Sequence, residues 1–187
     1  AFIPKRFTYS ILRRLHSDSE RVLVPSVSML NELKKYNFKN LVVWNRGVDT
    51  ELFNPNKRDT NSKDRQLTYV GRVAIEKNIE EFLKLKGNYN KTVVGDGPEL
   101  QKYINKYPEI NFVGVKTGDE LAKYYANADV FVFPSKTDTL GNVILEALAS
   151  GTPIAAYPVT GPIDVLTDEK INTCLLYTSD AADDLVG

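Results

Sequence analysis

The 187-residue sequence is 42% hydrophobic, which is enough to build a core, and its 24 basic residues equal its 24 acidic residues in number. This balance excludes an overall field that would recruit nucleic acid or an anionic membrane. No apolar run approaches the roughly 18 to 20 residues that a membrane-spanning helix needs, and the first residues lack the layout of a secretory signal. We therefore expect a globular protein, with the cytoplasm as its default location.

Residues 1–16 predict an amphipathic helix. Four apolar side chains share one of its faces, and these are Ile3, Phe7, Ile11 and Leu15. A basic amphipathic helix can lie on a membrane surface, but we favour packing of the apolar face into a domain that is missing from this sequence. His16, the only histidine, follows this helix away from any strand end, so we expect a structural or capping role for it.

A β-α-β unit is predicted next. An apolar run over 20–26 indicates a strand, the spacing of the apolar residues that follow indicates a helix, and residues from Asn40 indicate a second strand with Trp44 in the core. The polar stretch 49–66 has almost no apolar residues after Phe53, and we interpret it as a linker between domains.

From Leu67 onward strands and helices alternate, which is typical of a doubly wound parallel sheet. Pro98 is placed as a first-turn helix residue, and Gly151 ends a helix that covers 141–150. Each strand ends in a glycine or small polar turn, which is where such sheets bind ligands. We therefore predict an α/β domain over 67–173, preceded by the linker 49–66 and by part of another domain over 1–48.

The tail 174–187 has an unusual sequence. CLLYTSDAADD resembles the translation of a transposon adapter used in sequencing libraries, so we expect a non-native tail, with a real C-terminal helix or tail as the alternative. The sequence also opens without Met, and we expect the gene product to extend at both ends. Cys174, the only cysteine, has no internal disulfide partner and no metal-ligand neighbours at useful spacing.

Two carboxylates, Asp138 and Glu146, stand on either side of the start of the helix predicted at 141–150. A helix rises about 12 Å over eight residues, whereas a retaining glycosidase holds its carboxyl groups about 5 to 5.5 Å apart. The spacing therefore disfavours a close catalytic pair. The wider inverting spacing of about 6.5 to 9.5 Å is not excluded, because Asp138 lies on a loop. An elongated ligand across the helix start fits the two positions better.

The start of this helix is suited to an anion. The backbone N–H groups of Thr139, Leu140 and Gly141 stand there, at the positive end of the helix dipole. Carboxylates accept hydrogen bonds from hydroxyl groups, so a diphosphate over the helix end leaves Asp138 for one polyol and Glu146 for another. A hexose, a diphosphate and a ribose in a row have this shape. The ligand suggested is a nucleotide sugar.

Cations for the diphosphate are expected from the turn after the strand that starts at Leu67, where Arg72 and Lys77 lie. Arginine binds phosphate oxygens as a fork and lysine as a point charge. The alternative is that Arg72 pairs with a neighbouring acid and Lys77 is solvated. Two cations beside a diphosphate remove the need for a metal ion, and the sequence offers no convincing metal cluster.

Several stretches resemble one enzyme family, and these are GRVAIEKNIE, VVGDGPEL, NFVGV and, most specifically, FPSKTDTLGNVILEALASGTPIAAYPVTGP. They are similar to the donor-binding half of retaining glycosyltransferases of the GT-B fold, family 4, in particular the bacterial branch that resembles α-mannosyltransferases and sulfolipid synthases. VLVPS and NRGVDTELFNP resemble the segment that joins the two domains of this family. The resemblance covers about residues 8–170. It implies a truncated Rossmann-like donor domain and a remnant of a second Rossmann-like domain.

The resemblance also implies roles by position. Arg72 and Lys77 would bind the donor diphosphate and stabilise the departing charge. Asp138 would contact the donor sugar and Glu146 the ribose hydroxyls. The further implied donor contacts are the backbone amides of Thr139, Leu140 and Gly141 and the base contacts of Val115 and Lys116. Gly95 and Gly97 are expected to make a tight turn near the nucleotide. Asp138 departs from the more usual Glu, which leaves the identity of the sugar open.

The implied reaction transfers a mannose- or glucose-type hexose from GDP-mannose or a UDP-hexose, with retention at the anomeric carbon and without a metal or other cofactor. The branch suggests a membrane lipid as acceptor, which would place a cytoplasmic enzyme at the inner membrane face. We expect this fragment alone to be inactive, and we expect no nucleic-acid partner. A GT-B nucleotide-sugar epimerase and a non-catalytic nucleotide-sugar-binding module are the alternatives.

Overall fold

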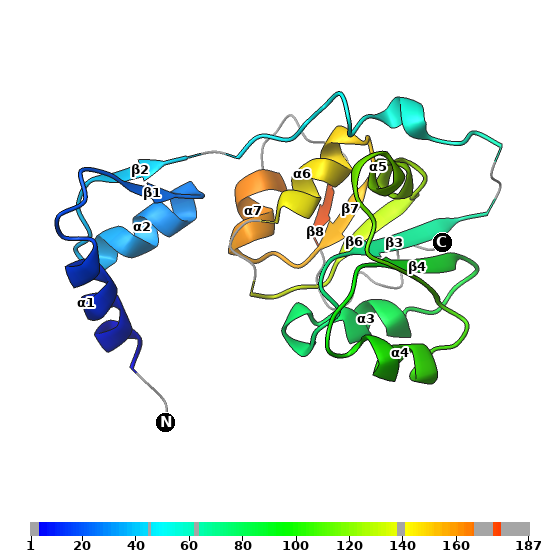
Figure 1. Ribbon diagram of the computed structural model, residues 1–187, viewed down its shortest axis with the longest axis horizontal. Helices are drawn as coiled ribbons and strands as arrows, with labels where there is room; N and C mark the ends of the chain where they lie inside the picture. Colours follow the sequence, from blue (N-terminus) through cyan, green and yellow to red (C-terminus); the bar gives the residue numbers. More distant parts are fainter. Residues whose placement is uncertain (1–3, 45, 62–63, 138–140, 167–173, 177–187) are drawn as a thin grey trace. The chain divides into compact units, whose positions relative to one another are not determined.

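The computed structural model describes residues 4–44, 46–61, 64–137, 141–166 and 174–176. The chain divides into two compact units, one over residues 1–46 and one over residues 47–187. The polar stretch 49–66, which we expected to be a linker, is grouped with the second unit. In both units strands and helices alternate along the chain (Figure 1).

The first unit is the predicted β-α-β unit with one helix before it. Its elements are α1 (Lys5–Leu15), β1 (Val22–Val24), α2 (Val27–Lys35) and β2 (Leu41–Val43), and β1 pairs with β2 in parallel. Ser26 caps α2, because its side chain accepts a hydrogen bond of 3.2 Å from the Met29 N–H. Helix α1 contacts the end of α2 through Tyr9, whose ring stacks on that of the C-cap residue Tyr36 at 4.1 Å between centroids.

Trp44 is not in the core as we predicted, since it is 61% exposed. Val42 is exposed on the same side of β2, because alternate residues of a strand share a face. Helix α2 packs on the other face, where Val24 is buried and Val43 packs against it. The predicted apolar face of α1 is also bare, with Phe7 at 59% and Leu15 at 72% exposed.

The second unit is a doubly wound α/β domain, as predicted. All neighbouring strands of its sheet pair in parallel, in the order β5-β4-β3-β6-β7-β8. The strands are β3 (Gln66–Val70), β4 (Asn90–Val94), β5 (Asn111–Gly114), β6 (Val130–Phe133), β7 (Ile154–Ala156) and β8 (Cys174–Leu176). The helices are α3 (Ile79–Lys84), α4 (Leu100–Lys106), α5 (Gly118–Ala126), α6 (Asn142–Ala149) and α7 (Thr160–Leu166), with short 3-10 turns η1 (Pro55–Lys57) and η2 (Ile75–Lys77).

Helices cover both faces of this sheet, with α3 and α4 on one side and α5, α6 and α7 on the other (Figure 1). The strands supply both cores because their side chains alternate between faces. Tyr69 and Val132 pack into the core beside α3, whereas Val70, Phe131 and Phe133 pack into the core beside α5 and α6. Burial on both faces is why these strands read as nearly continuous apolar runs in the sequence.

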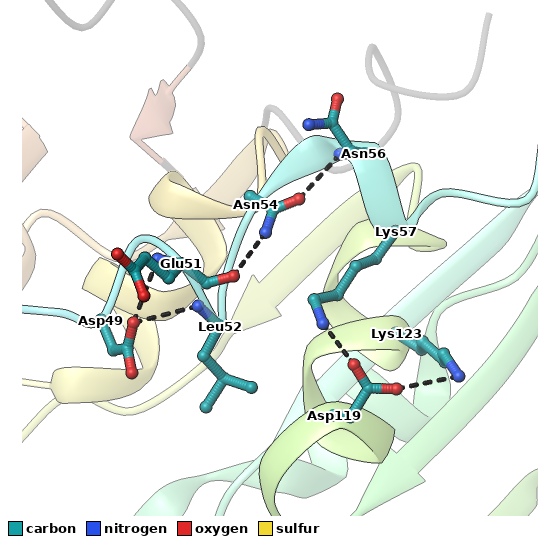
Figure 2. Close-up of polar contacts among 8 residues, drawn as sticks. All are labelled: Asp49, Glu51, Leu52, Asn54, Asn56, Lys57, Asp119 and Lys123. Atoms are coloured by element: carbon teal, nitrogen blue, oxygen red, sulfur yellow. Dashed lines mark hydrogen bonds and ion pairs between the residues drawn. The ribbon is translucent and has the colours of Figure 1, made fainter.

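The first part of the expected linker packs against the second unit. Phe53 is buried there at 7% exposure, and its ring meets Tyr125 edge-on at 5.8 Å between centroids. Asp49 closes the turn before it by accepting hydrogen bonds of 3.0 Å from the N–H groups of Glu51 and Leu52 (Figure 2). The connection is therefore anchored to the second unit rather than loose.

A small cluster of charged side chains links Lys57 of this segment to α5. Asp119 accepts from Lys57 and, at 2.9 Å, from Lys123 (Figure 2). These two lysines, Lys57 first, lower the pKa of Asp119 from 3.8 to about 2.

We expect the free energy of unfolding of Asp119→Asn to change less between pH 7 and pH 2.5 than that of the parent chain. A carboxyl group whose pKa is lower in the folded state stabilises the fold above its unfolded pKa of 3.8, and this contribution is lost as the pH falls toward 2. Urea unfolding at pH 7 and pH 2.5 measures the effect. The variant should lose less stability than the parent between these two pH values, and an identical loss in both proteins would contradict the assignment.

Strand β8 lies within the tail that we interpreted as foreign. Cys174–Leu176 pairs in parallel with β7, with Ile154 opposite Cys174. Residues 177–187 lie outside the described residues. The adapter origin of the tail stays a prediction, because strand pairing does not report where a sequence comes from.

Candidate functional site

The crevice of the second unit lies where β3 and β6 are neighbours. The chain continues from β3 to β4 and β5 on one side, whereas β6 continues to β7 and β8 on the other. In open parallel sheets ligands bind outside the carboxyl ends of the strands at such a switch point. The residues that follow Val70 and Phe133 are therefore expected to form the site.

A cavity of about 600 Å³ occupies this place. Three segments line it: the end of β3 and its turn, the end of β6 and its loop, and the start of α6. The lining residues are Tyr69, Val70, Gly71, Arg72, Glu76, Lys77, Phe133, Ser135, Thr137, Gly141, Asn142 and Val143. The structure thus brings Arg72, Lys77 and Gly141 of the predicted site to one cavity. Asp138, Thr139 and Leu140 lie outside the described residues.

Two hydrogen bonds tie the turn after β3 to the loop after β6. The Asn78 side chain donates to the Pro134 carbonyl at 3.1 Å, and the Thr137 hydroxyl donates to the Glu76 carbonyl at 3.4 Å. Asn78 has a left-handed backbone, with φ at 52°, and it separates η2 from α3. For this reason the regular helix of this segment begins only at Ile79. The turn that carries Arg72 and Lys77 is therefore held by hydrogen bonds to the loop on the other side of the crevice.

Arg72 makes the ion pair that we named as its alternative role. Its guanidinium lies 3.4 Å from the Glu76 carboxylate, and its side chain is 63% exposed. An exposed pair of this kind contributes little to stability, about 0 to 1 kcal/mol. A phosphate group can therefore replace Glu76 as the partner of Arg72 at low cost. Lys77, in the same turn, is half-buried.

Helix α6 begins at the cavity. Its N-cap residue is Gly141, so no side chain caps the first turn. Gly141 also keeps this entrance open, because a Cβ atom there would lie 3.2 Å from the Phe133 ring. The dipole of α6 and its first amide groups favour an anion beside Arg72 and Lys77.

Glu146 lies on α6 one turn beyond Asn142 and on the same face, since residues four apart are neighbours on a helix. It does not line the cavity itself. Its Oε2 accepts a hydrogen bond of 2.8 Å from the Tyr125 hydroxyl of α5. Tyr125 is fully buried, and burial raises the pKa of its hydroxyl, with the Glu146 charge adding to the shift. Tyr125 therefore keeps its proton and holds one oxygen of Glu146.

Tyr125→Phe should release Glu146 without emptying the core, because the ring stays between Phe53 and Phe131. We expect a stability loss of about 1 kcal/mol, typical of one hydrogen bond. Nucleotide affinity should fall about three- to tenfold, because the carboxylate loses its orientation. Calorimetric titration with UDP or GDP measures this effect. An unchanged affinity would show that Tyr125 does not orient Glu146 for nucleotide binding.

The turn formed by Gly95, Asp96 and Gly97 packs against the turn after β3. A Cβ atom on Gly97 would lie 2.2 Å from the Val73 carbonyl oxygen, and one on Gly95 would lie 2.0 Å from that of Gly71. Hydrogen bonds join the same segments, with the Val73 N–H donating to the Asp96 carbonyl at 2.9 Å. Gly97 thus packs against the cationic turn and does not line the cavity. Helix α4 starts at Leu100, after Pro98 rather than at it.

Gly97→Ala is expected to destabilise the second unit by about 1 to 3 kcal/mol, the usual cost of overpacking. The added methyl group meets backbone, which cannot swing aside as a side chain can. Gly47→Ala is the matched control, because a Cβ atom there has no neighbour within 4 Å. Urea midpoints measure the difference. Equal midpoints for the two variants would contradict the packing role.

Val115 and Lys116, the predicted base contacts, follow β5 at the same edge of the sheet but do not line the cavity. Val115 is 64% exposed. Lys116 pairs with Glu120 one turn along α5, and this hydrogen bond raises the pKa of Lys116. The structure does not bring these two residues together with Arg72, and their role stays a prediction.

Comparison with known proteins identifies the family. A sequence model described as "Glycosyl transferases group 1" matches residues 51–187, most of the chain. The chain belongs to this family. It is also 35% identical, over 179 residues, to a GDP-mannose-dependent alpha-mannosyltransferase of Corynebacterium glutamicum, with 90% of this chain and 43% of that protein covered. The sulfoquinovosyl transferase SQD2 of Arabidopsis thaliana is 34% identical over 197 residues, with 95% of this chain and 38% of that protein covered.

An alpha-monoglucosyldiacylglycerol synthase of Streptococcus pneumoniae is 29% identical over 183 residues, with 82% of this chain and 41% of that protein covered. The chain therefore spans less than half the length of these curated relatives. Among solved structures, sucrose-phosphate synthase from Thermosynechococcus elongatus superposes with a TM-score of 0.80 at 24% identity, with 97% of this chain and 51% of that chain covered. The predicted GT-B fold of this glycosyltransferase chain is confirmed.

Sequence reasoning missed several residues that line the cavity, among them Tyr69, Ser135, Thr137 and Asn142. Ser135 is 1% exposed and accepts from the Thr137 N–H at 3.5 Å, so it shapes the loop after β6. The signal that could have found Ser135 and Thr137 is their place directly after a strand buried on both faces. No comparable signal pointed to Tyr69, which lies inside a strand.

Within the described residues, no group of three or more His, Cys, Asp or Glu side chains could hold a metal ion. Arg72 and Lys77 line the cavity, where they and the first amide groups of α6 can meet a diphosphate. Metal-independent transfer stays a prediction.

Proposed function

We propose that this glycosyltransferase transfers a hexose from a nucleoside diphosphate sugar to an acceptor hydroxyl, with retention at the anomeric carbon. The observation that carries the proposal is the cavity that joins Arg72 and Lys77 to the start of α6 at the switch point of the sheet. A diphosphate there meets two cations and a helix N-terminus. The name of the Corynebacterium relative favours GDP-mannose as donor, and a UDP-hexose is the second donor to test.

In the proposed reaction the bond between the anomeric carbon and the phosphate oxygen breaks, and the acceptor oxygen bonds to the same face of that carbon. The acceptor proton passes to the departing phosphate oxygen, so no protein nucleophile is needed. Negative charge accumulates on the diphosphate as it leaves. Arg72 and Lys77 stabilise this charge, which is the largest contribution that such sites usually make. Asp138 is assigned to the donor sugar and Glu146 to the ribose.

The acceptor is proposed to be a membrane lipid. The support is the name of the Streptococcus pneumoniae relative, a diacylglycerol glycosyl synthase. In the described part of the chain no helix has both the length and the apolar character to cross a bilayer. A protein that works on a lipid can bind the membrane surface, and we propose this for the cytoplasmic face.

Donor binding is tested by thermal unfolding of the 187-residue chain with a panel of GDP- and UDP-sugars. A donor present at 100 times its Kd adds about 2.7 kcal/mol of stability, or roughly 5 to 10 °C for a chain of this size. Arg72→Gln should remove about half of the shift or more, because a tenfold loss of affinity lowers the added stability to about 1.4 kcal/mol. No shift with any nucleotide sugar would contradict the proposal.

Transfer is tested with the complete gene product, because the chain spans less than half of its curated relatives. A transferase releases nucleoside diphosphate only as glycoside forms. Conversion of the donor sugar without acceptor would instead show an epimerase, and binding without turnover would show a binding module.

A further inference from the structure

Two overlapping cavities of the first unit form a groove between α1 and the turn that joins α2 to β2. Their volumes are about 560 and 350 Å³, and they share Ser10, Arg13 and Asn37. Every charged side chain that lines them is basic. These are Arg6, Arg13, Arg14, Lys35 and Lys39, with His16 beside them. We call this surface the basic groove.

The basic groove follows one face of α1. Arg6, Ser10 and Arg13 are spaced four and three residues apart, so they lie in a row on α1, and Ser17 follows in the turn after the helix. The opposite wall is the turn from Lys35 to Asn40. The two walls are held together by the Tyr9–Tyr36 stack and by a 3.4 Å hydrogen bond from the Arg13 guanidinium to the Tyr36 carbonyl. The groove is thus shaped by packed residues on both sides.

Charge is strongly concentrated in this unit. Residues 1–46 contain nine basic and three acidic side chains, a balance of +6, although the whole chain is neutral. Of the nearby acids, Glu32 accepts from Lys5 and Tyr9 at 2.6 and 2.9 Å, and Asp18 accepts from the Ser17 hydroxyl at 3.1 Å. Neither acid lines the groove.

Helix dipoles explain only part of this arrangement. Arg13, Arg14 and Lys35 stand in the last turns of their helices, where a positive charge is favourable. Arg6 stands in the first turn of α1, where the dipole disfavours it, and Lys39 lies outside both helices. An anion in the groove would offset the repulsion among these side chains. His16 caps the end of α1 through its backbone, as we predicted from the sequence.

We propose that the basic groove binds a phosphate group, either free phosphate or the phosphate of a lipid headgroup. The site is separate from the donor cavity, which belongs to the second unit. Guanidinium groups bind phosphate oxygens as a fork, and Ser10 and Asn37 supply neutral donors. The proposal does not depend on the donor site.

The test is a titration of the isotope-labelled 187-residue chain with sodium phosphate, followed by NMR of the backbone amides. Amides of residues 10–17 and 36–40 should shift and saturate. Arg13→Gln should weaken this binding at least fivefold, and the side chain is exposed, so the fold should persist. Arg21→Gln removes the same charge from an exposed position outside both cavities and should weaken binding less than twofold. Equal losses in the two variants, or shifts that do not saturate, would overturn the proposal.

Sedimentation with vesicles separates the two phosphate sources. Vesicles of phosphatidylglycerol in phosphatidylcholine that bind the parent chain, and bind Arg13→Gln at least fivefold less, identify the lipid headgroup. Saturable phosphate binding without vesicle binding identifies a free phosphate. Arg72→Gln serves as the reference for the donor cavity. If that variant removes the phosphate shifts of residues 10–17, the groove is not the site.

Discussion

The double substitution Arg72→Gln/Lys77→Gln is expected to weaken binding of a nucleoside diphosphate by about 100-fold or more. A hydrogen bond to a charged group contributes about 1.5 to 3 kcal/mol, which is tenfold or more in affinity. Both side chains line the cavity beside the start of α6, so both should contact the diphosphate. Calorimetric titration with UDP and GDP measures the loss.

The matched control for this prediction removes two lysines from elsewhere in the second unit. Lys84 and Lys86 are exposed and lie outside the cavity, so Lys84→Gln/Lys86→Gln should change affinity less than twofold. Uridine and guanosine carry no phosphate, and any binding of these nucleosides should be equal in the parent and in the Arg72/Lys77 variant. If the double substitution weakens binding of the nucleosides as much as binding of the nucleoside diphosphates, Arg72 and Lys77 do not contact phosphate.

Replacing Glu146 by Gln is expected to weaken the binding of every ribonucleotide by about tenfold to 100-fold. The carboxylate is proposed to accept hydrogen bonds from both ribose hydroxyl groups, and an amide supplies one weaker acceptor. Gln preserves the size of the side chain and can still accept from Tyr125, so the core should survive. Glu146→Ala should weaken binding further, and it should also cost about 1 to 3 kcal/mol of stability because it leaves the buried Tyr125 hydroxyl without its acceptor.

A nucleotide without ribose hydroxyls makes the ribose assignment of Glu146 specific. A 2′,3′-dideoxynucleoside diphosphate should bind the parent chain and Glu146→Gln equally, because neither can use the missing groups. The same comparison applies to Tyr125→Phe. A loss of the same size with the dideoxy and the ordinary nucleotide would show that Glu146 acts on the fold and not on the ribose.

Much of the fold could be predicted because the apolar pattern of the second unit is unambiguous. The run Val130–Phe133 is buried on both faces, and helix α6 stops at Gly151, which has a left-handed backbone with φ at 70°. Trp44 shows the limit of such reasoning. A large aromatic residue in an apolar strand suggests a core position, but the face that carries it depends on which side of the two-stranded sheet is covered.

The residues of the candidate site that lie in turns next to a strand or helix could be predicted from the local sequence. Arg72, Lys77 and Gly141 each stand at a turn that follows or precedes a regular element, and the structure places all three at one cavity. Contacts between distant segments could not be predicted in this way. Nothing in the sequence near Tyr125 indicates that it holds Glu146, and the GDG motif does not reveal that Gly97 packs against Val73.

The most direct test of the account is a crystal structure of this chain with UDP or GDP bound. We predict the diphosphate in the cavity between β3 and β6, with its oxygens about 3 Å from the Arg72 and Lys77 side chains and from the first amide groups of α6. Arg72 should have exchanged Glu76 for phosphate. A well-ordered nucleotide whose diphosphate contacts neither cation would contradict the central claim.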